Sequence, residues 1–251
     1  MPRSPHGGRR RAENLKARIA SDAQDHFLKC TIIGCGQPTL RAAKTGLAIA
    51  LCRKHQLHRQ RHGSPFCPSP SAAVLKPYLR AANQLIEFRR NDPYVGATLA
   101  GVRELTETAG PVVIATRLRG LPPDQRAKVA LARLREAGVK PERLLAIALA
   151  VCALIEDNPG ATHRISEWRI VAIAKAAHRL ASGYHRVWRF EDASGRIVQQ
   201  AELHKYPRSS GRVLRYLGET IEKQCEWVID RHLAEVVALK VARNAEQAST
   251  P

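Results

Sequence analysis

The sequence predicts a mainly α-helical protein that carries a small zinc-binding module near its N-terminus. Hydrophobic residues make up 44% of the chain but aromatic residues only 5%, so the core must be built from aliphatic side chains and alanine, a composition that favours helices. Apolar residues recur at helical spacing through most of the chain after residue 72. Four of the six cysteines fall within the first 67 residues. We therefore expect a module followed by a multi-helix domain with one β-hairpin and a long C-terminal helix.

Changes in composition divide the chain into four parts. Residues 1–28 combine an Arg-rich basic tail with a short helix, and the zinc-binding module occupies 29–67. A stretch rich in Pro and Ser, 64–71, is typical of a linker. It precedes a helical domain over 72–182, and the remaining residues, 183–251, hold the β-hairpin and the C-terminal helix.

Five helices are expected in the helical domain, because Pro and Gly residues mark boundaries between segments of helical periodicity. These helices are Ala72 to Arg90, Tyr94 to Thr108, Pro122 to Ala137, Pro141 to Asp157 and His163 to Ser182. Beyond them, 184–191 and 196–203 alternate in polarity around the turn 192–195, which predicts a β-hairpin. The pattern over 212–244 predicts one long helix.

Four residues in the module have the spacing of metal ligands. Cys30 and Cys35 form a C-x4-C pair, and Cys52 and His55 form a C-x2-H pair. Zinc prefers four tetrahedral Cys and His ligands in structural sites. Gly34 favours the turn that the first pair needs, and residues three apart share one face of a helix. We therefore expect a structural Zn²⁺ held by these four residues.

The fourth ligand has alternatives in the sequence. Three nearby residues, His58, His62 and Cys67, could each replace His55, although only His55 completes a C-x2-H pair. The isolated cysteines Cys152 and Cys225 lie in apolar helical stretches, so we expect ordinary buried thiols there.

Charge points to a polyanionic partner. The net charge is +19, and residues 1–67 carry 13 Lys and Arg against 3 Asp and Glu. Such an excess favours nucleic acid through counterion release. The candidate nucleic-acid-binding residues surround the second ligand pair on the same expected helix and would contact phosphates: they are Arg53, Lys54, Arg59, Arg61 and His62. The alternative is a solvated helix face without a ligand.

The segment 30–65 resembles a short zinc-binding module of bacterial and phage proteins, seen in some HNH-type homing endonucleases. The matching residues are Cys30, Gly34, Cys35, Pro38, Cys52, His55, Arg59, Arg61, His62, Gly63, Ser64 and Pro65. The resemblance implies DNA binding on a mobile element. No His-rich ββα pattern follows the linker, so the resemblance does not imply catalysis.

No secretory signal is visible, and the most apolar run, 144–155, is too short to cross a bilayer. We therefore expect a reducing, cytoplasmic environment, where clustered cysteines bind metal more often than each other. The resemblance implies that the protein is bacterial or phage-encoded. The sequence shows no Ser/His/Asp set, no Gly-rich phosphate loop and no carboxylate cluster for magnesium.

These observations predict a zinc-containing protein that binds nucleic acid, most simply double-stranded DNA, as an accessory or regulatory factor of a phage, plasmid or other mobile element. A nuclease or recombinase with unrecognised catalytic residues is one alternative. Another is an adaptor whose zinc is purely structural and whose C-terminal helix binds a protein or a second copy of the chain. The segment 141–182 also has the outline of a helix-turn-helix, with His163, Arg164, Arg169, Lys175 and Arg179 on the second element.

Overall fold

The structure is a computed structural model of the 251-residue chain. It describes residues 29–114, 117–158, 166–181, 183–205, 209 and 211–248. The basic tail and the short helix expected within 1–28 lie outside these residues. The chain divides into two compact units, whose boundary falls between Leu57 and His58. The finer domain limits expected from the sequence remain a prediction.

In the first unit, residues 29–52 form a loop structure held by backbone hydrogen bonds. Lys29 and Pro38 form an isolated antiparallel bridge, and the N–H of Thr31 donates to the carbonyl of Ala50 over 2.9 Å. Helix α2 (Arg53–His62) follows and runs across the boundary between the units.

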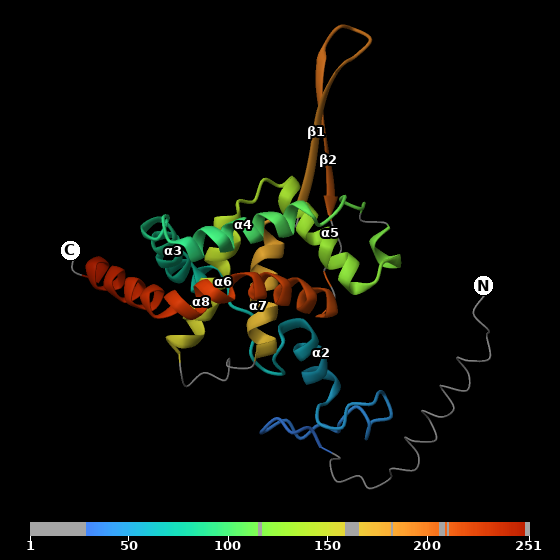
Figure 1. Cartoon of the computed structure of the whole chain (residues 1–251). Coiled ribbons are helices and arrows are strands. Elements are labelled where there is room, and N and C mark those ends of the chain that lie inside the picture. Colours follow the sequence, from blue (N-terminus) through green and yellow to red (C-terminus); the bar gives the residue numbers. More distant parts are fainter. Residues whose placement is uncertain are drawn as a thin grey trace, which may run out of the picture. The chain divides into compact units, whose positions relative to one another are not determined.

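The second unit contains the remaining helices, in the order expected from the sequence (Figure 1). Pro at the first turn of α4, α5 and α6 leaves no helical hydrogen bond unmade, and Ser71 and Asp92 accept N–H groups at the starts of α3 and α4. The bounds are α3 Ala72–Phe88, α4 Pro93–Glu107, α5 Pro123–Glu136, α6 Pro141–Glu156, α7 Ser166–Arg179 and α8 Gly211–Ala248, with a short 3₁₀ helix at Leu118–Gly120.

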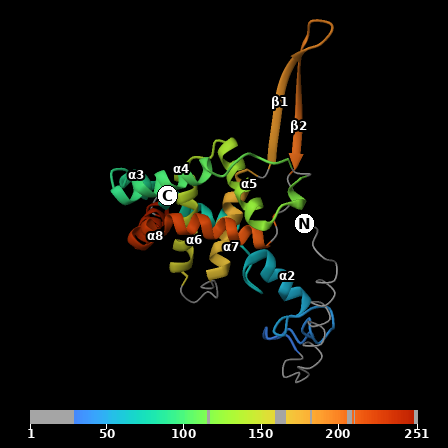
Figure 2. The ribbon, with the colours of Figure 1, turned by 45° about the vertical axis from the view of Figure 1, so that its right-hand side comes forward.

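Helix α6 is the centre of the core. Its side chains from Leu144 to Leu154 are all buried, because it packs against α3, α4, α7 and α8. A helix that is apolar on every side has to be surrounded in this way. Helix α8 crosses α6 and α7 in both views (Figures 1 and 2) and also packs on α3, α4 and α5. One aliphatic core therefore joins the helices of this unit.

The β-hairpin predicted from the sequence is also present. Strands β1 (Gly183–Glu191) and β2 (Ile197–Lys205) pair antiparallel, with Trp188 opposite Gln200. The turn is held by Asp192, whose Oδ1 accepts the N–H groups of Ser194 and Arg196. The mainly helical fold with one hairpin and a long C-terminal helix is confirmed. None of the helices in the described part of the chain has both the length and the apolar character that a membrane crossing requires.

Candidate metal centre and its basic surroundings

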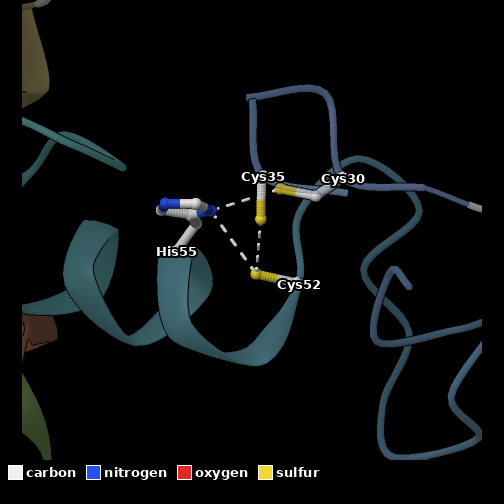
Figure 3. A group of neighbouring side chains, drawn as sticks. All are labelled: Cys30, Cys35, Cys52 and His55. Carbon is white, nitrogen blue, oxygen red and sulfur yellow. Dashed lines mark hydrogen bonds between the residues drawn. The ribbon is translucent and has the colours of Figure 1, made fainter. Parts of the chain in front are cut away.

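The four predicted ligands converge in space. The ligand atoms of Cys30, Cys35, Cys52 and His55 all lie within 4.8 Å of one another. Figure 3 shows the two cysteines of the first pair on the loop, Cys52 at the start of α2 and His55 on the helix itself, all pointing to a common centre. All four residues belong to the first unit.

Local backbone geometry places the first pair. The N–H of Cys30 donates to the carbonyl of Gln37 over 2.8 Å, and the N–H of Cys35 donates to the carbonyl of Ile32 over 3.0 Å. The turn between the two cysteines passes through Gly34. Its φ of +77° lies in the left-handed region, which favours glycine at this position. The predicted tight turn is present, and it directs both sulfurs inward.

The second pair uses the beginning of α2. The helix starts at Arg53, one residue after Cys52, slightly later than the start near Ala50 expected from the sequence. The carbonyl of Cys52 accepts the N–H of Gln56 over 2.9 Å. His55 lies in the first turn, where its Nδ1 is 3.4 Å from the Sγ of Cys52 and 3.3 Å from the Sγ of Cys30.

These separations match those around a tetrahedral zinc ion. Bonds of about 2.3 Å to sulfur and about 2.0 Å to nitrogen put two sulfurs about 3.8 Å apart, and sulfur and nitrogen about 3.5 Å apart. The Sγ atoms of Cys35 and Cys52 are 3.7 Å apart, too far for a disulfide, and all described cysteines are free thiols. The four residues are therefore close enough to hold a metal ion, with three soft sulfur donors and one imidazole.

The surroundings lower the pKa of two of the three thiols. Burial acts to raise the pKa of Cys30 and of Cys52, but hydrogen bonds from the backbone outweigh this effect and lower both pKa values. At Cys30 these bonds come from the backbone of Cys52 and Ile32, and at Cys52 from the backbone of His55. At Cys35 a hydrogen bond from the backbone of Gln37 lowers the pKa, yet burial and the two neighbouring sulfurs raise it overall. A cation at the centre would favour the thiolate form of all three.

The alternative ligands are engaged elsewhere. His58 lies with its Nδ1 2.8 Å from the carbonyl oxygen of Ser64. The Nδ1 of His62 accepts the N–H of Ser69 over 2.8 Å. Cys67 is buried in the core of the helical unit. His55 is thus the histidine in the cluster. Cys152 and Cys225 are buried as expected, and burial raises the pKa of each to about 12.

The candidate nucleic-acid-binding residues fall into two groups. Arg53, Lys54 and Arg61 are exposed, and none of the three takes part in an ion pair with a described residue. Arg59 is also exposed, but its Nε donates to Glu167 over 2.9 Å. His62 cannot serve as a cation near neutral pH, because burial, together with Lys175, His58 and Arg61, lowers its pKa to about 4.

Sequence inspection missed how firmly the end of α2 is anchored to α7 within the helical unit. Glu167 accepts from Arg59 and, over 2.7 Å, from the Nε of Arg215. The φ of Gly63 is +74°, and a Cβ there would lie 2.3 Å from the carbonyl oxygen of Glu167. Trp168 donates its Nε1–H to the carbonyl of Pro68 over 3.1 Å. Only the conformational freedom of Gly63 was visible in advance.

Helix α7, the second element of the expected helix-turn-helix, packs against other helices and is not free to act as a recognition helix. Helix α7 packs against α6 and α8 and buries Trp168, Val171 and Ile173, and its Arg169 pairs with Glu222. Most of α7 is therefore occupied by packing contacts, whereas the turn expected before it lies outside the described residues.

A separate exposed aromatic pair lies on the helical unit. Trp227 is 66% exposed and makes an edge contact with Tyr94, over which the guanidinium of Arg231 lies. The adjoining groove between α4 and α8 is lined by both acidic and basic side chains, among them Glu219, Lys223 and Glu226. Its mixed charge does not fit a polyanion.

Comparison of the chain with family models, with curated proteins and with solved structures finds no match in any of the three.

Proposed function

We propose that this protein binds zinc through Cys30, Cys35, Cys52 and His55 and uses the basic helix α2 to contact the phosphates of double-stranded DNA. The observation that carries the proposal is the convergence of the four ligands at the start of a helix whose exposed side chains include Arg53, Lys54 and Arg61. A closed Cys3His set suits a structural zinc, which orients the helix but takes no part in catalysis.

The choice of zinc follows from the donor set. Three thiolates and one imidazole at tetrahedral separations favour a soft or borderline cation over magnesium or calcium, which prefer oxygen ligands. A structural zinc also accounts for the small number of buried side chains around the cluster, because metal binding supplies free energy of folding.

The choice of nucleic acid follows from charge. The chain carries +19 in total, and the first turn of α2 presents two cations without an ion-pair partner among the described residues. An accessory or regulatory factor on a phage, plasmid or other mobile element would fit such a charge and the resemblance of the module. No described cluster of carboxylates or histidines adds a catalytic metal site, and catalysis is not part of the proposal.

The first test is the metal itself. Elemental mass spectrometry of purified protein should find one zinc per chain in the wild type and none in Cys30→Ser. Cys67→Ser is the matched control, since it removes another buried cysteine near α2 outside the cluster and should keep the zinc. Equal metal content in all three proteins would contradict the assigned ligand set.

The second test is binding of a fluorescent DNA duplex at several salt concentrations. Wild-type affinity should fall steeply with salt, by a log–log slope of about −0.9 per neutralised phosphate. Double replacement Arg53→Gln with Lys54→Gln should reduce that slope by about two. Binding that is absent, or that does not respond to salt, would remove the nucleic-acid part of the proposal and leave the zinc part intact.

A further inference from the structure

A second group of cations lies in the helical unit, where Lys175 of α7 meets the last turn of α2. Lys175 is on α7, one turn before Arg179, and Arg61 and His62 close α2. The Nζ of Lys175 is 3.1 Å from the Nδ1 of His62. Residues 113 positions apart in the sequence thus meet at this point.

The ammonium group of Lys175 has one described hydrogen-bond partner, the Nδ1 of His62. The Nδ1 of His62 also accepts the backbone N–H of Ser69 over 2.8 Å. Lys175 therefore shares the lone pair of this nitrogen with the N–H of Ser69. Among the described residues, no carboxylate forms an ion pair with Lys175 or Arg61. An ammonium has three N–H donors, and two of those on Lys175 have no described acceptor.

The electrostatics of this group are repulsive. Burial, and then the charges of Arg179 and Arg61, lower the pKa of Lys175 to about 8. Burial, followed by the charges of Lys175, His58 and Arg61, lowers the pKa of His62 to about 4. The contrast with Glu167 is direct, because that carboxylate lies between Arg59 and Arg215 and offsets their charges. Neither Lys175 nor Arg61 forms an ion pair with an anion among the described residues.

We propose that Lys175 and Arg61, with Arg179 beside them, form a binding site for a phosphate group. A phosphate oxygen can accept the free N–H groups of Lys175, while the guanidinium of Arg61 suits a second oxygen of the same group. The anchoring of α2 by Gly63, Trp168 and Glu167 holds the two sides of this site in place.

The source of the phosphate follows from the proposed function, on which this step rests: a phosphodiester of bound DNA is the first expectation, and free inorganic phosphate is the other. The site would add to the proposed DNA contact a lysine of α7 that the sequence indicated only as part of a possible helix-turn-helix.

The test compares three variants in the duplex-binding assay: Lys175→Gln, Arg61→Gln and the control Lys76→Gln, which removes an exposed lysine from α3. Lys175→Gln and Arg61→Gln should each weaken binding roughly tenfold at 0.1 M salt and reduce the salt slope by about one. Lys76→Gln should change neither. Wild-type binding with equal affinities for Lys175→Gln and Lys76→Gln would overturn this site while leaving the proposed function standing.

Two further measurements separate the remaining outcomes. Thermal unfolding should show that Lys175→Gln is at least as stable as the wild type, because the substitution removes a repelled charge. A lowered Tm would mean that Lys175 is a structural residue and would overturn the site.

Acylation of lysines at pH 8, read by mass spectrometry, then identifies the ligand without relying on DNA affinity.

In that experiment, a DNA duplex should protect Lys175 and not Lys76. If the wild type fails to bind DNA, the proposed function is wrong. The acylation of Lys175 with and without inorganic phosphate then tests the site by itself. Protection of Lys175 by millimolar phosphate would support a site for the free anion, whereas unchanged acylation with both ligands would overturn it.

Discussion

The metal-cluster segment 29–57 and the helical unit from residue 58 differ in what their interiors contain. In 29–57 only four residues are buried, namely Cys30, Thr39, Leu51 and Cys52, and two of these are candidate ligands. In the helical unit, α6 alone buries eleven consecutive side chains. The comparison teaches that the proposed metal ion would supply in the segment the free energy of folding that hydrophobic burial supplies in the helical unit.

The largest expected effect is therefore metal removal. A chelator, or Cys52→Ser, should remove a contribution of about 10 kcal/mol or more from the folding of 29–57, while the helical unit keeps its structure. Hydrogen exchange resolved along the chain would show loss of protection at the N–H of Cys30 and Thr31, with unchanged protection in α6. Equal protection of 29–57 with and without metal would break the comparison.

A core truncation should do the reverse. Leu149 of α6 is fully buried, so Leu149→Ala creates a cavity in the core. This variant should lose about 2–5 kcal/mol of unfolding free energy, measured with urea, without a change in metal content. Val241→Ala, at a position that is 54% exposed on α8, is the matched control and should cost under about 0.5 kcal/mol. Similar losses for both would contradict the placement of the core.

A polar link between helices should have an intermediate effect. Asp157, just after α6, accepts from Tyr78 of α3 over 2.7 Å and from Lys240 of α8 over 2.6 Å, and these two bonds, that of Lys240 first, lower its pKa. Asp157→Asn should cost about 2 kcal/mol, since a partly buried ammonium loses its counterion. Glu87→Gln, which removes the exposed pair with Arg90, should have almost no effect in the same urea titration.

The smallest expected effect is a dependence on pH confined to the helical unit. Burial, followed by the charge of Arg133, lowers the pKa of His178 from 6.5 to about 4. The unfolded chain then binds a proton that the folded chain does not, so stability is complete above pH 6.5 and falls as the pH drops towards 4. Between pH 6.5 and 5.5 this histidine should cost about 1 kcal/mol.

Urea unfolding followed by helical circular dichroism at the two pH values would measure this loss. His178→Gln is the control, because glutamine can still bond to the hydroxyl of Ser209, which lies 2.9 Å from His178 Nε2, but does not titrate. An unchanged pH dependence in that variant would assign the effect to other groups.

Much of the fold was predictable because its signals are local. Pro at the first turn of α6 and Gly138 after α5 placed these helix ends within one residue of the structure. Helix α7 is described from Ser166 onward, so the start expected at His163 lies outside the described residues. The hairpin followed from alternation around a turn that Asp192 and Gly195 stabilise.

The ligand set was equally local. Cys30 and Cys35 are joined by one tight turn, and Cys52 and His55 by one turn of helix, so spacing alone predicted both pairs. The helical class of the chain followed from the periodicity of its apolar residues. Tertiary structure decided the rest: it engaged His58 and His62 elsewhere, paired Arg59 with Glu167, and brought Lys175 to the end of α2. The contacts of Arg59 with Glu167 and of Lys175 with His62 join residues 108 and 113 positions apart, and no local pattern in the sequence specifies which elements α7 contacts.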